Sequence, residues 1–228
     1  MDNPWTHLPN DAPFVLPEDD GSVRAFNKRH AGKPTEVLFD QLPSPYVGNP
    51  EAAIVLLNLN PAYALETAST PTLAMFTDIA KANFAHRFFD YPFYPLDPRL
   101  EGSPSGYEWW SKRCLGDLIR ESEIDVKEFA KKIFCAEFFP YHSRKYGWDG
   151  GVLPSQRYTM ALVDAAVLRG ALLIALWGNG NKGAWLKAVP SLSSNNIITL
   201  HSAQNPKISR GNLGDGLFEK IIKRLRIG

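Results

Sequence analysis

The sequence lacks the features that mark several common classes of protein. It has only two cysteines in 228 residues, Cys114 and Cys135, and their separation matches no metal-ligand spacing. This excludes an all-cysteine iron–sulfur or zinc site and argues against a disulfide-rich secreted scaffold. No apolar run approaches the roughly 20 residues that a helix needs to cross a bilayer. We expect no cofactor, no bound metal and no membrane association.

The chain also lacks an excess of charge of one sign. With 25 basic and 24 acidic side chains, its formal net charge is +1, so the totals do not indicate a strongly basic nucleic-acid-binding protein. The first residues are polar and proline-rich, without the basic and apolar regions of a signal peptide. We therefore expect a cytoplasmic protein, and we expect it to be a monomer.

Apolar residues, by contrast, are plentiful enough for one substantial core. They make up 44% of the chain, which suits a single domain of moderate size. Residues 1–50 are rich in proline and charge and show no regular pattern, ending in the turn formers PSPYVGNP. We interpret residues 1–50 as an irregular arm that packs on a single α/β domain spanning residues 51–228.

Four short apolar runs alternate with helical patterns in residues 51–228. The runs predict strands at residues 53–59, 133–139, 171–177 and 196–200. Helices are predicted at residues 72–84, 107–121, 126–132, 155–169, 182–187 and 216–225. Strands that are apolar on both faces and alternate with helices are typical of a parallel sheet covered on both sides. The predicted fold is a three-layer α/β/α structure with a central four-stranded parallel sheet.

Polar residues stand at the end of each predicted strand. They are Asn58, Asn60 and Pro61 after the first, Glu137, Tyr141 and His142 after the second, Trp177 to Asn179 after the third, and His201, Ser202 and Asn205 after the fourth. The carboxyl ends of parallel strands share one edge, and ligands bind there. Amides, histidines, aromatics and a single carboxylate suit the recognition of a flat, hydrogen-bonding ring better than metal chemistry.

Residues 178–183, with the sequence GNGNKG, match the pattern G-x-G-x-x-G. In dinucleotide-binding proteins that pattern follows the first strand, and an acidic residue ends the next strand. Here it follows the third predicted strand, and the next strand ends in His201. We therefore interpret the glycines as a tight turn that allows a close approach of the following helix.

Two of the strand ends resemble motifs of the uracil-DNA glycosylase superfamily, which has a parallel four-stranded α/β/α core. The family's first motif commonly reads Gly-x-Asn-Pro-Gly or Gly-x-Asp-Pro-Tyr, and residues 58–62 (NLNPA) match it at Asn60-Pro61, with Asn58 and Ala62 in place of the glycines. Its second motif, often His-Pro-Ser-Pro, matches by position at His201, while residues 202–206 (SAQNP) depart from it. A base-reading asparagine on the family's second strand corresponds by position to Glu137. By the order of elements, the resemblance covers about residues 50 to 226.

The resemblance implies a DNA glycosylase-like hydrolase, which cleaves the N-glycosidic bond of a flipped, modified or damaged base in DNA. Asn60 would orient the attacking water through its amide oxygen, and His201 would donate a hydrogen bond to the leaving base. The implied base-binding residues are Asn58, Pro61, Phe76 (stacking under the ring), Glu137, Tyr141, His142 and Asn205. The implied phosphate contacts are Arg144, Lys145, Ser202, Lys207 and Arg210.

Glu137 sets an expectation about the base. An ionised carboxylate only accepts hydrogen bonds, so it would pair with the N3–H of uracil and repel its O4. With an ionised Glu137, we expect a base edge richer in donors than that of uracil.

Each of these residues also has a purely structural explanation. Asn60-Pro61 can start a turn, His201 can be a structural histidine, and Glu137 can pair with Arg144 or Arg157 in the core. The aromatic residues Trp109 and Trp110 are expected to pack in the core. Two alternative functions also remain: a non-catalytic nucleobase, nucleotide or DNA-binding module, and a different small-molecule enzyme on the same fold.

Overall fold

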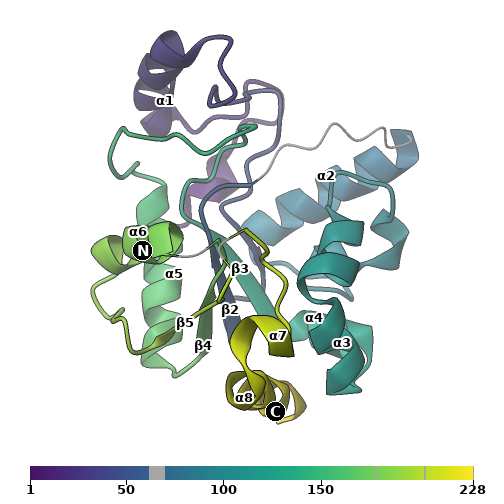
Figure 1. Ribbon diagram of the computed structural model, residues 1–228. Helices are drawn as coiled ribbons and strands as arrows, with labels where there is room; N and C mark the ends of the chain where they lie inside the picture. Colours follow the sequence, from purple (N-terminus) through teal and green to yellow (C-terminus); the bar gives the residue numbers. More distant parts are fainter. Residues whose placement is uncertain (62–69, 178, 203, 228) are drawn as a thin grey trace.

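A five-stranded sheet with helices on both faces forms the centre of this protein (Figure 1). The structure, a computed structural model, describes residues 1–61, 70–177, 179–202 and 204–227. Its strands are β1 (Tyr46–Gly48), β2 (Ile54–Asn58), β3 (Ile133–Glu137), β4 (Leu172–Ala175) and β5 (Ile197–Thr199). Its α-helices are α1 (Pro17–His30), α2 (Thr70–Phe84), α3 (Gly116–Ser122), α4 (Val126–Lys131), α5 (Gln156–Leu168), α6 (Asn179–Ala188), α7 (Arg210–Leu213) and α8 (Asp215–Arg226). Shorter helical segments are η1 (Pro4–His7), η2 (Tyr94–Leu96), η3 (Pro98–Leu100) and η4 (Trp109–Cys114), the last a π-helix.

The sheet has the strand order β1-β3-β2-β4-β5. The four strands predicted from the apolar runs are present, and they pair with one another in parallel. The α/β class is confirmed, but the prediction of a four-stranded sheet is wrong. The short strand β1 pairs antiparallel with β3 and covers what would otherwise be an open edge of the sheet. Three residues with two prolines nearby give too weak a pattern to predict such a strand.

Residues 1–50, which we expected to be irregular, contain β1 and the 14-residue helix α1. Helix α1 begins at Pro17, and its first turn is acidic while its last turn is basic, both of which favour a helix. Its apolar residues Val23 and Phe26 are fully or almost fully buried against the sheet layer. These helix signals are present in the sequence but are hidden by the surrounding prolines.

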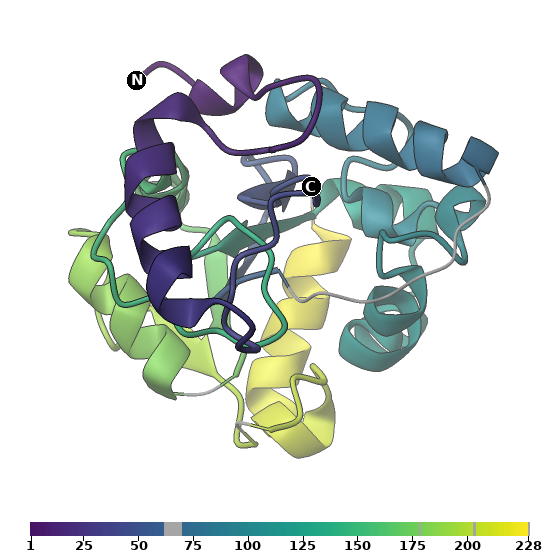
Figure 2. The same cartoon turned by 90° about the horizontal axis from the view of Figure 1, so that it is seen from above.

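The strands bury different residues on the two faces of the sheet. On one face, Leu57 and Ala136 pack in a cluster that includes residues of α1, α5 and α6. On the other face, Leu56 and Cys135 pack with residues of α2, α3, α4 and α8. Figure 2 shows α1 and α2 on opposite sides of the sheet. Because side chains alternate along a strand, Asn58 and Glu137 continue the second face.

The glycine-rich segment behaves differently from the prediction. Helix α6 begins at Asn179, inside the motif, and a Cβ atom at Gly180 or Gly183 would meet no atom within 4 Å. The predicted close approach at these two glycines is therefore wrong. Instead, the buried Asn181 donates hydrogen bonds to the carbonyl oxygens of Leu57 and Leu176, both at 2.6 Å, and so joins α6 to the ends of β2 and β4.

The helical region predicted at residues 107–121 is divided into the π-helix η4 and α3, and α7 was not predicted at all. Among the helices in the described part of the chain, none combines the length and the apolar character needed to span a bilayer.

Candidate functional site at the carboxyl edge of the sheet

Asn58 and Glu137 form a buried pair where β2 and β3 end. The parallel register places the two residues directly opposite each other, and the Asn58 side-chain amide donates a hydrogen bond of 2.9 Å to Glu137 Oε1. They are only 7% and 5% exposed. The partner of Glu137 is therefore an uncharged amide and not the buried arginine that we considered from the sequence.

The second oxygen of this carboxyl group, Glu137 Oε2, is buried and has no hydrogen-bond partner in the described structure. Burial raises the pKa of Glu137 from an ordinary 4.5 to about 8, while the hydrogen bond from Asn58 acts in the opposite direction. The neutral acid therefore predominates at pH 7. This overturns the premise of an ionised Glu137, and with it the expectation of a donor-rich base. An unpartnered buried oxygen is rare in native proteins and indicates a missing partner.

Asn60 is held in one orientation beside this pair. Its side-chain nitrogen donates to the Ser143 hydroxyl at 3.1 Å and to the carbonyl oxygen of Pro61 at 3.2 Å. Ser143 is buried, and its hydroxyl in turn donates to the carbonyl oxygen of Lys145 at 3.1 Å. Within the described residues no donor reaches the amide oxygen of Asn60. The amide group of Asn60 is thus fixed in direction.

Phe76 reaches the pair through another aromatic residue. Half-buried on α2, it meets the buried Tyr94 edge to face, with ring centroids 6.0 Å apart. Burial raises the pKa of Tyr94, whose hydroxyl hydrogen-bonds to the Ser44 side chain and lies close enough to Cys135 and Glu137 to interact electrostatically with both. Tyr94 therefore lies near Glu137, and Phe76 packs against Tyr94, so that aromatic rings line this side of the pair.

His201 follows β5 and has an exposed side chain. Strand β4 lies between β5 and β2, so two strand spacings, about 10 Å, separate the chain at His201 from that at Asn60. The loop after His201 is organised by the buried Asn212, whose backbone oxygen accepts from His201 N at 2.9 Å and whose side-chain oxygen accepts from Ser202 N at 2.7 Å. The side-chain oxygen of Asn205 accepts from Lys207 N at 3.3 Å, which closes a local turn.

Tyr141 does not belong to this edge, although the sequence suggested it. It is 1% exposed, and its hydroxyl donates to Asp19 at 2.8 Å and accepts from Leu16 N at 3.2 Å. Burial raises the pKa of Asp19, against the lowering effect of hydrogen bonds from Ser155 and Tyr141. Tyr141 thus fastens α1 to the loop after β3. The neighbouring His142 is half-buried, and its backbone oxygen accepts from Leu38 N at 3.0 Å.

The residues proposed for phosphate contacts fall into two groups. Arg210 forms ion pairs with Glu121 at 2.7 Å and Glu219 at 2.6 Å, and Lys207 pairs with Asp117 at 3.0 Å. Their charges are therefore largely balanced by acidic neighbours. Arg144 and Lys145 both have exposed side chains on the loop after β3, and so lie nearer to Asn60 and Ser143 along the chain.

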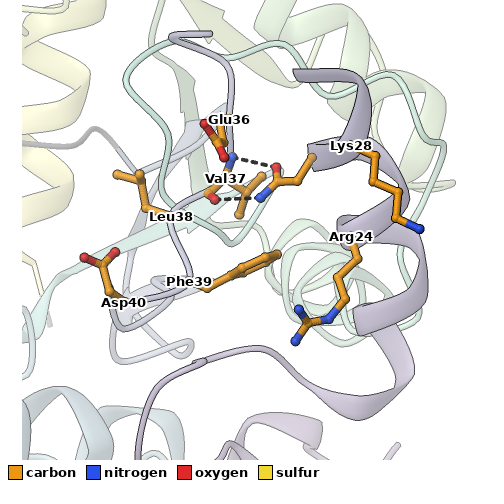
Figure 3. Close-up of a pocket in the computed structure, with 8 residues that line it drawn as sticks. Arg24, Lys28, Glu36, Val37, Leu38, Phe39 and Asp40 are labelled. Carbon is orange, nitrogen blue, oxygen red and sulfur yellow. Dashed lines mark hydrogen bonds between the residues drawn. The ribbon is translucent and has the colours of Figure 1, made fainter. Parts of the chain in front are cut away.

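A separate hollow is lined by none of these residues (Figure 3). Its volume is about 660 Å³, and it is lined by residues of α1 and of the segment 36–40. Two hydrogen bonds between the Asn27 side chain and the backbone of Val37, at 2.8 and 2.9 Å, tie the two segments together. The lining mixes Arg24 and Lys28 with Glu36 and Asp40 and includes none of the predicted site residues.

Several contributing residues were missed by sequence reasoning. Ser143 fixes Asn60, Tyr94 flanks Glu137, Asn181 joins three elements, and the indole N–H of Trp185 donates to Asn58 O at 2.9 Å. Of these, Ser143 carried a signal, because it stands among the residues that follow the second predicted strand. Among the described residues, no three His, Cys, Asp or Glu side chains gather in a way that could hold a metal ion. The motif residues Ala62, Gly178 and Ala203 lie outside the described residues.

Comparison with known proteins finds no matching family model, no matching curated protein and no matching solved structure.

Proposed function

We propose that this protein is a DNA glycosylase-like hydrolase that cleaves the N-glycosidic bond of a flipped, modified base. The observation that carries the proposal is the buried Asn58–Glu137 pair, whose Oε2 has no partner among the described residues, next to an Asn60 that Ser143 holds in one orientation. A buried polar pair at the carboxyl edge of a parallel sheet is where such folds bind ligands.

The protonation state of Glu137 suggests which base edge fits. A neutral Glu137 donates from Oε2–H to a carbonyl oxygen, whereas Asn58, whose nitrogen is already used by Glu137, keeps its amide oxygen as an acceptor for a ring N–H. A carbonyl beside a ring N–H is the lactam edge. Deamination creates that edge from the amino-substituted edges of cytosine and adenine, whereas guanine and thymine already carry it. The substrate class that we propose is a deaminated base, uracil or hypoxanthine.

In the proposed reaction Asn60 acts by orientation. An amide is too weak a base to remove a proton from water, but a fixed amide oxygen can hold a water in line with the sugar carbon. As the bond to the base breaks, positive charge develops on the sugar and negative charge on the base. His201 would donate a hydrogen bond to the base oxygen. The spacing of about 10 Å between the two chain segments leaves room for a base and its sugar between them.

Base release from a panel of oligonucleotides tests this proposal. The panel carries uracil or hypoxanthine at one position, with cytosine and adenine as the parent controls and with thymine and guanine as normal bases that carry the same edge. We expect release of at least one deaminated base by the wild type and roughly 100-fold slower release by Asn60→Ala. Asn195→Ala, an exposed asparagine on the loop before β5, is the matched control and should release base at the wild-type rate. Equal rates for wild type and Asn60→Ala would refute the role of Asn60.

A non-catalytic nucleobase or nucleotide-binding module is the second candidate. It is favoured by the ion pairs that already occupy Arg210 and Lys207, because they weaken the grip on a DNA backbone. Binding of the modified oligonucleotides, or of the free bases, without release of any base would support the module over the hydrolase.

A further inference from the structure

Two departures from regular geometry meet at the carboxyl edge of the sheet, and the proposed reaction uses neither. Trp177, just after β4, has a φ angle of +62° and is 38% exposed. A bulky residue in the left-handed region is a genuine outlier, and such strain clusters at functional sites. The second departure is η4, a six-residue π-helix that begins at Trp109. π-Helical segments are rare and are also frequent at functional sites.

The two departures bring two indole rings together. Trp109 and Trp177 are nearly parallel, with an interplanar angle of 14° and ring centroids 6.3 Å apart. Behind them, Trp110 packs edge to face against Trp109 at 4.5 Å and against the buried Phe93 at 4.9 Å. This series of rings runs from a fully buried residue to an exposed one. Phe93 and Trp110 hold Trp109 on its buried side, and Trp109 in turn supports Trp177, part of which is exposed to solvent.

The position of Trp177 connects it to the proposed pocket. In the parallel register Ala175 is paired with Thr199, and Trp177 and His201 each follow two residues later. Strand β4 also lies next to β2, which ends at Asn58. Trp177 therefore stands on the strand between the buried Asn58–Glu137 pair and the exposed His201. A ring that stacks on Trp177 would neighbour a base held by the pair.

The charges at this edge decide between double-stranded and single-stranded partners. Binding to a duplex depends strongly on basic side chains that neutralise phosphates, and here Lys207 and Arg210 are already paired with acidic residues. Single-stranded nucleic acids are bound to a larger degree by stacking of unpaired bases on aromatic side chains. The structure offers an exposed, supported indole, and two of the four basic residues proposed for phosphate contacts, Lys207 and Arg210, are engaged in ion pairs, which fits the second pattern better.

We propose that Trp177, backed by Trp109, stacks an unpaired base next to the one in the pocket, and that the protein acts on single-stranded DNA. This deepens the proposed function and rests on it for the identity of the ligand. Because stacking on one aromatic residue contributes a sequence-tolerant part of the affinity, the same contact forms with unmodified single strands.

The test measures the affinity of a fluorescently labelled, unmodified 12-nucleotide single strand by anisotropy, with the matching duplex alongside. Three variants are compared with the wild type. Trp177→Gly removes the ring at a position whose φ angle glycine adopts without strain, so this variant should fold. Trp177→Phe keeps an aromatic ring. Phe89→Ala is the control, because Phe89 is also an exposed aromatic residue (53%). Its neighbour Asp90 pairs with Lys127 in α4, the helix that leads into the amino end of β3, opposite the carboxyl edge.

We expect Trp177→Gly to weaken binding of the single strand by about 10-fold or more. Trp177→Phe should stay within about threefold of the wild type, and Phe89→Ala should not differ from it. The wild type should prefer the single strand to the duplex. Equal affinity of Trp177→Gly and wild type for the single strand, or tighter binding of the duplex, would overturn the proposal.

This experiment separates the two proposals because it needs no cleavage. Loss of binding in Trp177→Gly, together with no base release by any form of the protein, would support stacking on Trp177 and contradict the proposed hydrolase activity. Suppose instead that the wild type releases base and that Trp177→Gly changes neither the release nor the binding. This result would support the proposed hydrolase activity and overturn stacking on Trp177.

Discussion

The buried carboxyl group of Glu137 leads to a prediction about stability. Because its pKa is raised from 4.5 to about 8 on folding, the folded protein binds a proton that the unfolded chain releases between these values. Stability from this group is therefore fully present below about pH 4.5 and is lost as the pH rises through about 8. Glu137→Gln removes the titration and keeps the shape. Its amide oxygen can accept from Asn58, and its nitrogen can take the place of Oε2.

The size of the effect follows from the shift. Each pKa unit corresponds to about 1.4 kcal/mol, so the cost of ionising Glu137 grows by at most about 4 kcal/mol between pH 5 and pH 8. Relaxation of the surroundings and entry of water reduce such penalties in real proteins. We expect the stability of Glu137→Gln relative to the wild type to rise by about 2–4 kcal/mol over this range.

Urea unfolding followed by tryptophan fluorescence at pH 5, 6, 7 and 8 measures this difference directly. Asn195→Ala, which replaces an exposed neutral residue on the loop before β5, is the control, and its difference from the wild type should not change with pH. Parallel pH profiles for wild type and Glu137→Gln would show that Glu137 is ionised or solvated in the folded state, and the reasoning about its neutral form would be refuted.

Three further predictions concern the surroundings of the edge. Trp177→Gly should change the free energy of unfolding by less than about 1 kcal/mol, because relief of the left-handed strain offsets the lost ring contact. Trp110→Ala, which removes a buried ring, should cost about 3–5 kcal/mol. Thermal melts of the two variants measure the difference. Tyr141→Phe should lower stability by about 2 kcal/mol through the lost hydrogen bond to Asp19, with base-release kinetics of the folded protein unchanged, and slower release would contradict its structural assignment. Asn181→Ala should lose about 1–3 kcal/mol in urea unfolding, because the carbonyl oxygens of Leu57 and Leu176 both lose a side-chain donor and that of Leu57 keeps only the backbone N–H of Leu176; an unaffected midpoint would count against this linking role.

The core of the fold could be predicted because its signals are local and strong. Apolar runs such as Ile54–Asn58 and Ile133–Glu137 are long enough to identify strands that are buried on both faces, and their parallel arrangement follows from the helices between them. The edge strand Tyr46–Gly48 could not be predicted, since three residues carry no usable pattern and its pairing with β3 depends on contacts about 90 residues away in sequence.

The candidate site was predicted in part. The positions of Asn58 and Glu137 at adjacent strand ends follow from the sheet rule, but their direct hydrogen bond and the neutral state of Glu137 depend on burial, which a sequence does not display. Tyr141 stands at a strand end in the sequence, yet the chain turns there and its hydroxyl points to α1. The role of Trp109 and Trp177 depends on a π-helix and a left-handed residue, and neither has a sequence signature.

The most direct test of the proposed site is the pH dependence of base release from a single-stranded oligonucleotide that carries one deaminated base. If neutral Glu137 donates to the base carbonyl, release by the wild type should fall as the pH rises through about 8, and Glu137→Gln, which keeps a donor at every pH, should lack that fall. A wild-type rate that stays constant or rises from pH 7 to pH 9, or no release of any deaminated base at pH 7, would contradict the proposal.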